Sequence, residues 1–189
     1  GLTGMPPHYE GARDAFAAVA VEDPDDDAVE AMSLGVTVPE LRAVCERYDL
    51  DPDTFWRARD SALAARQQAE MRAGRKVPYD DVGHLDTFDC PLGVVSSNQT
   101  ATVEFAFEYF DLDRHFATVY GRPPTVESLR RKKPAPYYVE QALSDLGVDH
   151  ALYVGDSETD VEAAHAAGID AAFVRRPHRR DVDLSVVPE

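Results

Sequence analysis

The chain has 189 residues, 44% of them hydrophobic, which suffices for one medium-sized domain or a core with a small inserted subdomain. Its 35 acidic residues outnumber 19 Lys and Arg residues, and the formal net charge is -16. This charge argues against nucleic acid and anionic membranes as general partners, because it repels their phosphate groups. The acid-rich, lysine-poor composition is typical of halophilic proteins, whose charge repulsion is screened by salt, with an ordinary acidic protein as the alternative.

Cysteine usage and hydropathy indicate a cytoplasmic protein. Cys45 and Cys90 lie far apart and show no metal-binding spacing, which fits a reducing compartment. No apolar run approaches the roughly 20 residues that span a bilayer, and residues 1–7 lack the features of a signal peptide.

The first 76 residues are predicted to form an all-helical block. Helical patterns cover residues 8–20, 38–48 and 52–74. Either Asp51 or Asp53 could cap the third helix, and Gly74 could end it.

Short apolar strands alternate with helices in residues 77–189. The patterns cover residues 92–95, 103–110, 117–120, 136–146, 152–154, 161–167 and 171–174. Gly147 and Gly168 stand where two of the helices should end. This alternation predicts an α/β fold with an open parallel, Rossmann-like sheet.

Three polar groups follow predicted strands, where ligands bind in such sheets. The first is Ser96-Ser97-Asn98, placed at the end of a strand and the start of a helix. A hydroxyl and backbone amides there could bind an anion. A plain helix cap by Ser97 or Asn98 is the alternative.

The second group is Lys133, which precedes Pro134 and should end a loop, while Pro134 starts the next helix. Its ammonium could face a phosphate. A solvated loop lysine is the alternative, since the preceding residues are also basic.

The third group is Asp156 and Asp160, directly after an apolar strand. Mg²⁺ typically takes one or two protein carboxylates together with water and substrate phosphate. Asp156 suits direct ligation, whereas Asp160 could bind the metal or orient one of its waters. The competing explanation is a helix N-terminus capped by acidic residues.

Together the segments Gly93-Val-Val-Ser-Ser-Asn98, Lys133-Pro-Ala-Pro136 and Val154-Gly-Asp-Ser-Glu-Thr-Asp160 resemble motifs two to four of the haloacid dehalogenase superfamily of hydrolases. The resemblance implies that the helical block is a small cap. It implies that Ser97, with Asn98, binds the phosphoryl group, that Lys133 stabilises its charge, and that Asp156 and Asp160 hold Mg²⁺. It further implies a phosphatase, similar to phosphoglycolate phosphatases, that acts on a small phosphorylated metabolite.

The chain departs from this family at the first motif, a strand running into Asp-x-Asp that supplies the nucleophile and an acid. Residues 1–7 contain no aspartate. Two segments with similar letters, residues 110–113 and 86–89, read as helix ends and turns rather than strand ends. We therefore expect additional N-terminal residues in the natural protein, including a strand between those ending at Val95 and Val154.

Other functions fit the same residues. A non-catalytic phosphate-binding or regulatory module would keep the same pocket, and a sugar-phosphate mutase would share the metal site. A 2-haloacid dehalogenase needs no Mg²⁺, so the two aspartates argue against it. Trp56, Arg57 and Arg59 could line a substrate entrance in the cap, although helix packing explains Trp56 equally well.

Overall fold

The computed structural model describes residues 8–176 of the chain, which fold into two compact units. The first unit contains the described residues up to Cys90, together with Asn98–His115 and Gly121–Arg130. The second contains Pro91–Ser97, Phe116–Tyr120 and the described residues from Arg131 onward. The predicted boundary between cap and core, at residue 76, stays a prediction.

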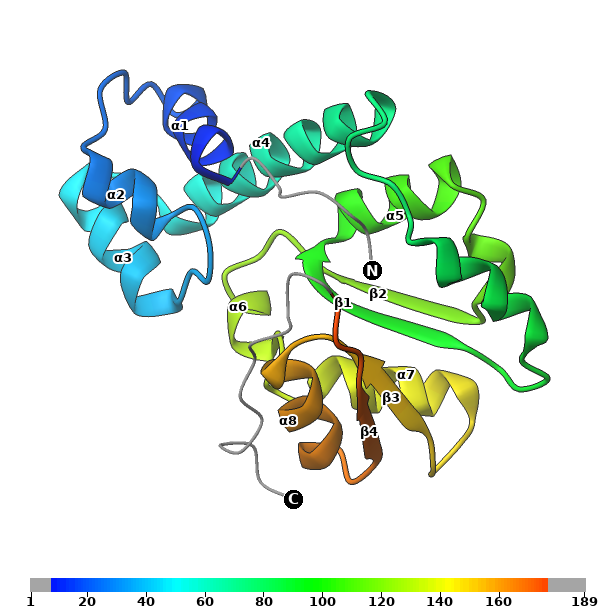
Figure 1. Cartoon of the computed structure of the whole chain (residues 1–189). Coiled ribbons are helices and arrows are strands. Elements are labelled where there is room, and N and C mark those ends of the chain that lie inside the picture. The colour runs from blue at the N-terminus through cyan, green and yellow to red at the C-terminus, as the bar shows by residue number, and fades with distance from the viewer. Residues whose placement is uncertain (1–7, 177–189) are drawn as a thin grey trace. The chain divides into compact units, whose positions relative to one another are not determined.

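Four helices build most of the first unit: α1 (His8–Ala18), α2 (Asp26–Ala31), α3 (Val38–Arg47) and α4 (Pro52–Arg72) (Figure 1). Their apolar faces meet in one core. The Phe16 ring lies at its centre, 4.8 Å from the ring of Phe55 and 5.4 Å from that of Tyr48 between ring centroids. The predicted all-helical block is therefore confirmed for the described residues.

Side-chain caps set where these helices begin. Thr37 and Glu40 form a capping box at the start of α3. The Asp51 carboxylate accepts a hydrogen bond from the Thr54 amide at 2.8 Å, so Asp51 rather than Asp53 caps α4. Gly74 follows the end of α4 with a φ of 70°, a conformation that glycine adopts without strain.

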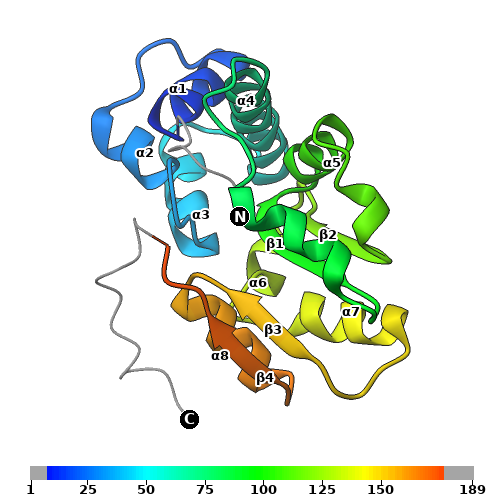
Figure 2. The same cartoon turned by 45° about the vertical axis from the view of Figure 1, so that its right-hand side comes forward.

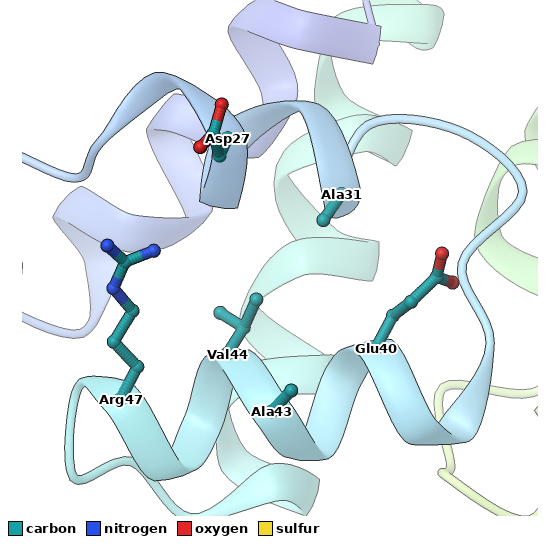
Figure 3. A pocket seen from close by; sticks show the side chains of 6 residues that line it. All are labelled: Asp27, Ala31, Glu40, Ala43, Val44 and Arg47. Carbon is teal, nitrogen blue, oxygen red and sulfur yellow. The ribbon is translucent and has the colours of Figure 1, made fainter.

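The short helix α2 was not predicted, because its acidic start reads as a turn. Asp25 caps it and accepts a hydrogen bond from the Ala28 amide. A depression of about 310 Å³ lies between α2 and α3 (Figure 3). None of the predicted site residues lines it; the lining residues are Asp27, Ala31, Glu40, Ala43, Val44 and Arg47.

The rest of the first unit includes η1 (Asp80–Thr87), α5 (Thr100–Tyr109), η2 (Asp113–His115) and the start of α6 (Ser128–Arg131). The Asp-rich segment at residues 86–89 lies in η1 and the turn after it, and residues 110–113 follow α5. Neither segment ends a strand, as predicted.

The second unit carries most of β1 (Gly93–Gln99) and β2 (Thr118–Arg122), together with α7 (Tyr137–Leu146), β3 (Leu152–Gly155), α8 (Glu158–Ala166) and β4 (Asp170–Phe173). Strands β1 and β2 form one two-stranded sheet. Strands β3 and β4 form another, which is parallel and pairs Leu152 with Asp170 (Figure 2). The α/β class and the parallel connection through α8 match the prediction.

Helices α7 and α8 supply the core of this unit. Buried Val139 on α7 and Ala163 and Ala164 on α8 pack with Ile169, and partly buried Val95 and Tyr153 contact the same cluster. The two predicted helix ends are confirmed, because Gly147 and Gly168 both have positive φ angles.

Two predicted boundaries were wrong. Strand β1 continues through Ser96, Ser97 and Asn98, and Gln99 is the N-cap of α5, although its side chain forms no capping hydrogen bond. Neither Ser97 nor Asn98 caps a helix, because pairing with β2 keeps this polar segment extended. Helix α7 begins at Tyr137 rather than at Pro134.

The two sheets of the second unit are not joined to each other. In the described part of the chain, β1 pairs only with β2, and β3 only with β4. Leu152 and Val154 on β3 are each 60% exposed, which is unusual for large apolar side chains at the centre of such a fold. The edges of β1 and β3 thus lack the intervening strand that the family resemblance implies.

Candidate active site

Lys133 is the centre of the candidate site. Its ammonium donates to the Val95 carbonyl at 3.0 Å and to the Tyr153 hydroxyl at 2.9 Å, and it forms an ion pair with Asp160 at 2.5 Å. These contacts use all three donors of the ammonium and connect β1, β3 and α8. Lys133 is therefore a partly buried structural cation and not a solvated loop lysine.

Asp160 is held on its other side by the start of α8. Its second carboxylate oxygen accepts hydrogen bonds from the amides of Asp156 and Ser157, both at 3.0 Å. Ser157 caps the helix and completes a capping box with Asp160. The carboxylate lies against Gly155, where any side chain would collide with it.

The charges of this site stabilise one another. Burial alone would raise the pKa of Asp160, but the Lys133 charge and the hydrogen bonds from Lys133 and Ser157 outweigh it, so the pKa lies below its ordinary value. Burial opposes the charged form of Lys133 too, yet Tyr153 and Asp160 raise its pKa above the ordinary value. Both groups are ionised at neutral pH.

Asp156 is the carboxylate better placed to ligate a metal. Both oxygens of Asp160 are occupied by Lys133 and by backbone amides, whereas Asp156 follows the last residue of β3 and is half-buried. One carboxylate with water and phosphate is a normal ligand set for Mg²⁺, so the residues present fit this ion. No cluster of three or more His, Cys, Asp or Glu side chains suited to a metal occurs within residues 8–176.

Ser97 lies two residues beyond Val95 on β1, and is exposed. Because side chains alternate along a strand, Ser97 is on the same face as Val95 and about 7 Å further along. Its hydroxyl forms no hydrogen bond with any described residue, which leaves it available to a ligand.

The Asn98 side chain is engaged elsewhere. Its amide exchanges two hydrogen bonds with Gln67 of α4, both at 2.9 Å, within the first unit. Trp56 and Arg59 are also buried in that unit, whereas Arg57 is exposed, so a role at a substrate entrance stays a prediction.

Sequence reasoning missed Tyr153. Its hydroxyl donates to the Val95 carbonyl at 2.9 Å and accepts from Lys133. In the sequence it is one residue of an apolar strand, and the only signal is a hydroxyl within that run. Burial raises the pKa of Tyr153, so it stays neutral.

The helices of the structure agree with the sequence, which contains no apolar run long enough to span a membrane. Among the described helices, none combines the length and hydropathy needed to cross a bilayer.

Comparison with known proteins gives consistent matches. The model of the haloacid dehalogenase-like hydrolase family matches residues 80–174, half of the chain. The phosphoglycolate phosphatase of Rhodobacter capsulatus is 31% identical over 120 residues, which are 62% of this chain and 53% of that protein. The pyrophosphatase PpaX of Oceanobacillus iheyensis is 30% identical over 98 residues, 51% of this chain and 44% of that protein.

A third relative, the phosphoglycolate phosphatase of Escherichia coli K12, is 33% identical over 91 residues, 47% of this chain and 34% of that protein. The chain therefore spans between a third and about half of the length of these curated relatives.

Solved structures share the fold. CbbY from Rhodobacter sphaeroides, crystallised with phosphate, superposes with a TM-score of 0.66 at 19% identity, covering 95% of this chain and 84% of that one. A haloacid dehalogenase-like hydrolase from Bacteroides fragilis gives a TM-score of 0.58 at 18% identity, covering 87% and 77%. With the matched segment containing Ser97, Lys133, Asp156 and Asp160, the chain belongs to the haloacid dehalogenase-like hydrolase family.

Proposed function

We propose that this chain contributes to a Mg²⁺-dependent phosphatase that hydrolyses a small phosphorylated metabolite. The observation that carries the proposal is the cluster in which Lys133, Asp160 and the backbone of Asp156 are fixed beside the end of β3. A buried cation and a half-buried carboxylate are the charges that phosphoryl transfer requires.

Ser97 and Lys133 would bind the transferring phosphoryl group. The Ser97 hydroxyl is exposed and could donate to a phosphoryl oxygen, with Asn98 as a further candidate for substrate binding. In the structure, the Lys133 ammonium donates one of its hydrogen bonds to the Val95 carbonyl. A strand paired with β1 would supply an amide to that carbonyl, and would free the ammonium for the phosphoryl group.

Asp156 would ligate Mg²⁺, and Asp160 would act chiefly by fixing the Asp156 backbone through its amide bond. When bound, the ion would supply positive charge that offsets the negative charge on the phosphoryl oxygens.

The nucleophile would be an aspartate on a strand outside this chain, between β1 and β3. Within residues 8–176 no strand pairs with the facing edges of β1 and β3, which supports this placement. The carboxylate oxygen would attack phosphorus, the ester P–O bond would break, and the alcohol would leave with a proton from an acid group. Water would then hydrolyse the aspartyl-phosphate to free phosphate and restore the carboxylate.

The substrate class comes from the relatives. Two of those named above are phosphoglycolate phosphatases, so 2-phosphoglycolate is the first compound to assay. A pyrophosphatase is also among them, so inorganic pyrophosphate is the second.

The test compares two aspartate variants expressed from the natural gene in native cells. Asp156→Asn should lower the Mg²⁺-dependent release of phosphate by at least about 100-fold. Asp170→Asn is the matched control, because Asp170 is exposed at the opposite end of the paired strands β3 and β4. Equal rates for the two variants would contradict the proposal. Mg²⁺-dependent binding of the ester without turnover by the unmodified protein would favour a non-catalytic binding module.

A further inference from the structure

The first unit contains more buried positive than negative charge at one face of α4. Arg59, Lys76 and Arg122 are all buried, and Asp60 is the one carboxylate buried among the described residues of this unit. Asp60 is already shared by both guanidinium groups, at 3.2 Å from Arg59 and 2.6 Å from Arg122. The ammonium of Lys76 forms no ion pair with Asp60.

Lys76 is 6% exposed, and within residues 8–176 its ammonium has one hydrogen-bond partner, the side-chain oxygen of Gln67. No described carboxylate lies within ion-pair distance of it. A buried ammonium that is bonded only to a neutral amide keeps most of its desolvation penalty, because an amide dipole does not neutralise a charge.

The groups next to Gln67 are neutral as well. Its amide nitrogen donates to Asn98 at 2.9 Å and to Gln99 at 3.1 Å, and Gln99 accepts from the Thr102 hydroxyl at 3.0 Å. The hydroxyl of Thr100, the next residue after Gln99, is buried without a hydrogen-bond partner. This network offers polar groups and no negative charge.

The pKa of His8 reflects the positive charges near it, including that of Lys76. Burial and the charges of Arg59 and Lys76 lower the pKa of His8 to about 4, so its imidazole is neutral at physiological pH. Its Nδ1 atom is buried and has no hydrogen-bond partner. Burial also lowers the pKa of Lys76 to about 8, which still leaves most of it charged at pH 7.

We infer that Lys76 binds the carboxylate or phosphate group of a small anion at the face of α4 that carries Gln67. The ligand would supply the negative charge that the surrounding residues lack. Val77, the next residue, is 37% exposed, so the segment that carries Lys76 reaches the surface. This site goes beyond the proposed function, because Lys76 has no role there, although Gln67 also bonds to Asn98, the further substrate-binding candidate.

The test is nuclear magnetic resonance of the full chain with labelled lysine side chains. The chain has three lysines, Lys76, Lys132 and Lys133, so each side-chain signal can be assigned by substitution. Inorganic phosphate and acetate are titrated separately at constant ionic strength, which distinguishes phosphate from carboxylate recognition. The inference predicts a saturable shift of the Lys76 signal with at least one anion, while the Lys132 signal stays in place.

Two variants separate this site from the proposed active site. The shift of the Lys76 signal should persist in Lys133→Met, whatever happens to phosphatase activity there. In Lys76→Met the anion should bind about 10- to 100-fold more weakly, as expected for a lost hydrogen bond to a charged group, whereas Lys132→Met should bind normally. The inference is overturned if neither anion shifts the Lys76 signal of the unmodified protein, or if Lys132 shifts equally.

Discussion

Replacing Lys133 by Met should destabilise the second unit in addition to any effect on catalysis. The side chain of Lys133 is 10% exposed and that of Asp160 is 7% exposed, so the substitution leaves a buried carboxylate without its cation. Breaking a buried ion pair in this way costs about 3–5 kcal/mol. Methionine roughly preserves the volume of the lysine side chain, and Asp160 keeps its two backbone hydrogen bonds. We therefore expect a loss of about 3 kcal/mol in unfolding free energy, at the lower end of this range.

The loss of unfolding free energy in Lys133→Met should be larger at neutral pH than at acidic pH. Because the pKa of Asp160 is lowered in the folded protein, its contribution is present above the unfolded value of about 3.9 and disappears as pH falls through the folded pKa. In Lys133→Met, burial without the cation should raise the pKa of Asp160. Protonation of Asp160 would then remove the unpaired buried charge and reduce the loss of unfolding free energy. The difference in unfolding free energy should therefore be largest near neutral pH and should shrink as the pH falls through the raised pKa of Asp160 in the variant, which lies above about 3.9.

The assay is urea unfolding of the unmodified protein and Lys133→Met between neutral and acidic pH. Lys132→Met is the matched control, since it removes the neighbouring positive charge. The double variant Lys133→Met/Asp160→Asn should recover part of the loss, because it removes the unpaired charge. The reasoning is refuted if Lys133→Met and Lys132→Met agree within about 0.5 kcal/mol at neutral pH.

Three further predictions concern stability. Asp60→Asn should cost about 3–5 kcal/mol in urea unfolding, because Asp60 is the shared buried partner of Arg59 and Arg122, and a loss below about 1 kcal/mol would contradict this role. Gly147→Ala should cost about 1 kcal/mol, since its φ is 66° and its surroundings are open, so a stabilised variant would exclude the left-handed conformation. With a net charge of -16, the thermal midpoint should rise between about 0.1 M and 1 M KCl, whereas a falling midpoint would argue against screened repulsion.

The strand and turn that carry Asp156 could be predicted from the sequence because every signal there is local. An apolar run leads into Gly155, and Ser157 with Asp160 follows the spacing of a capping box. The start of α4 at Asp51 was accessible for the same reason.

Contacts between distant segments could not be predicted in this way. The bonds from Lys133 and Tyr153 to the Val95 carbonyl join residues 38 and 58 positions apart, and no local pattern encodes them. The length of β1 was missed because Ser96 to Gln99 have weak strand propensity, which pairing with β2 overrides. The pairing of Asn98 with Gln67 depends on tertiary packing alone.

The most direct test is the release of phosphate from 2-phosphoglycolate by the protein purified from its native cells, measured with Mg²⁺ and after its removal by a chelator. The account predicts turnover that stops without Mg²⁺, returns when Mg²⁺ is added back, and is lost in Asp156→Asn. Turnover that is unchanged by the chelator and by Asp156→Asn would contradict the assignment of this site.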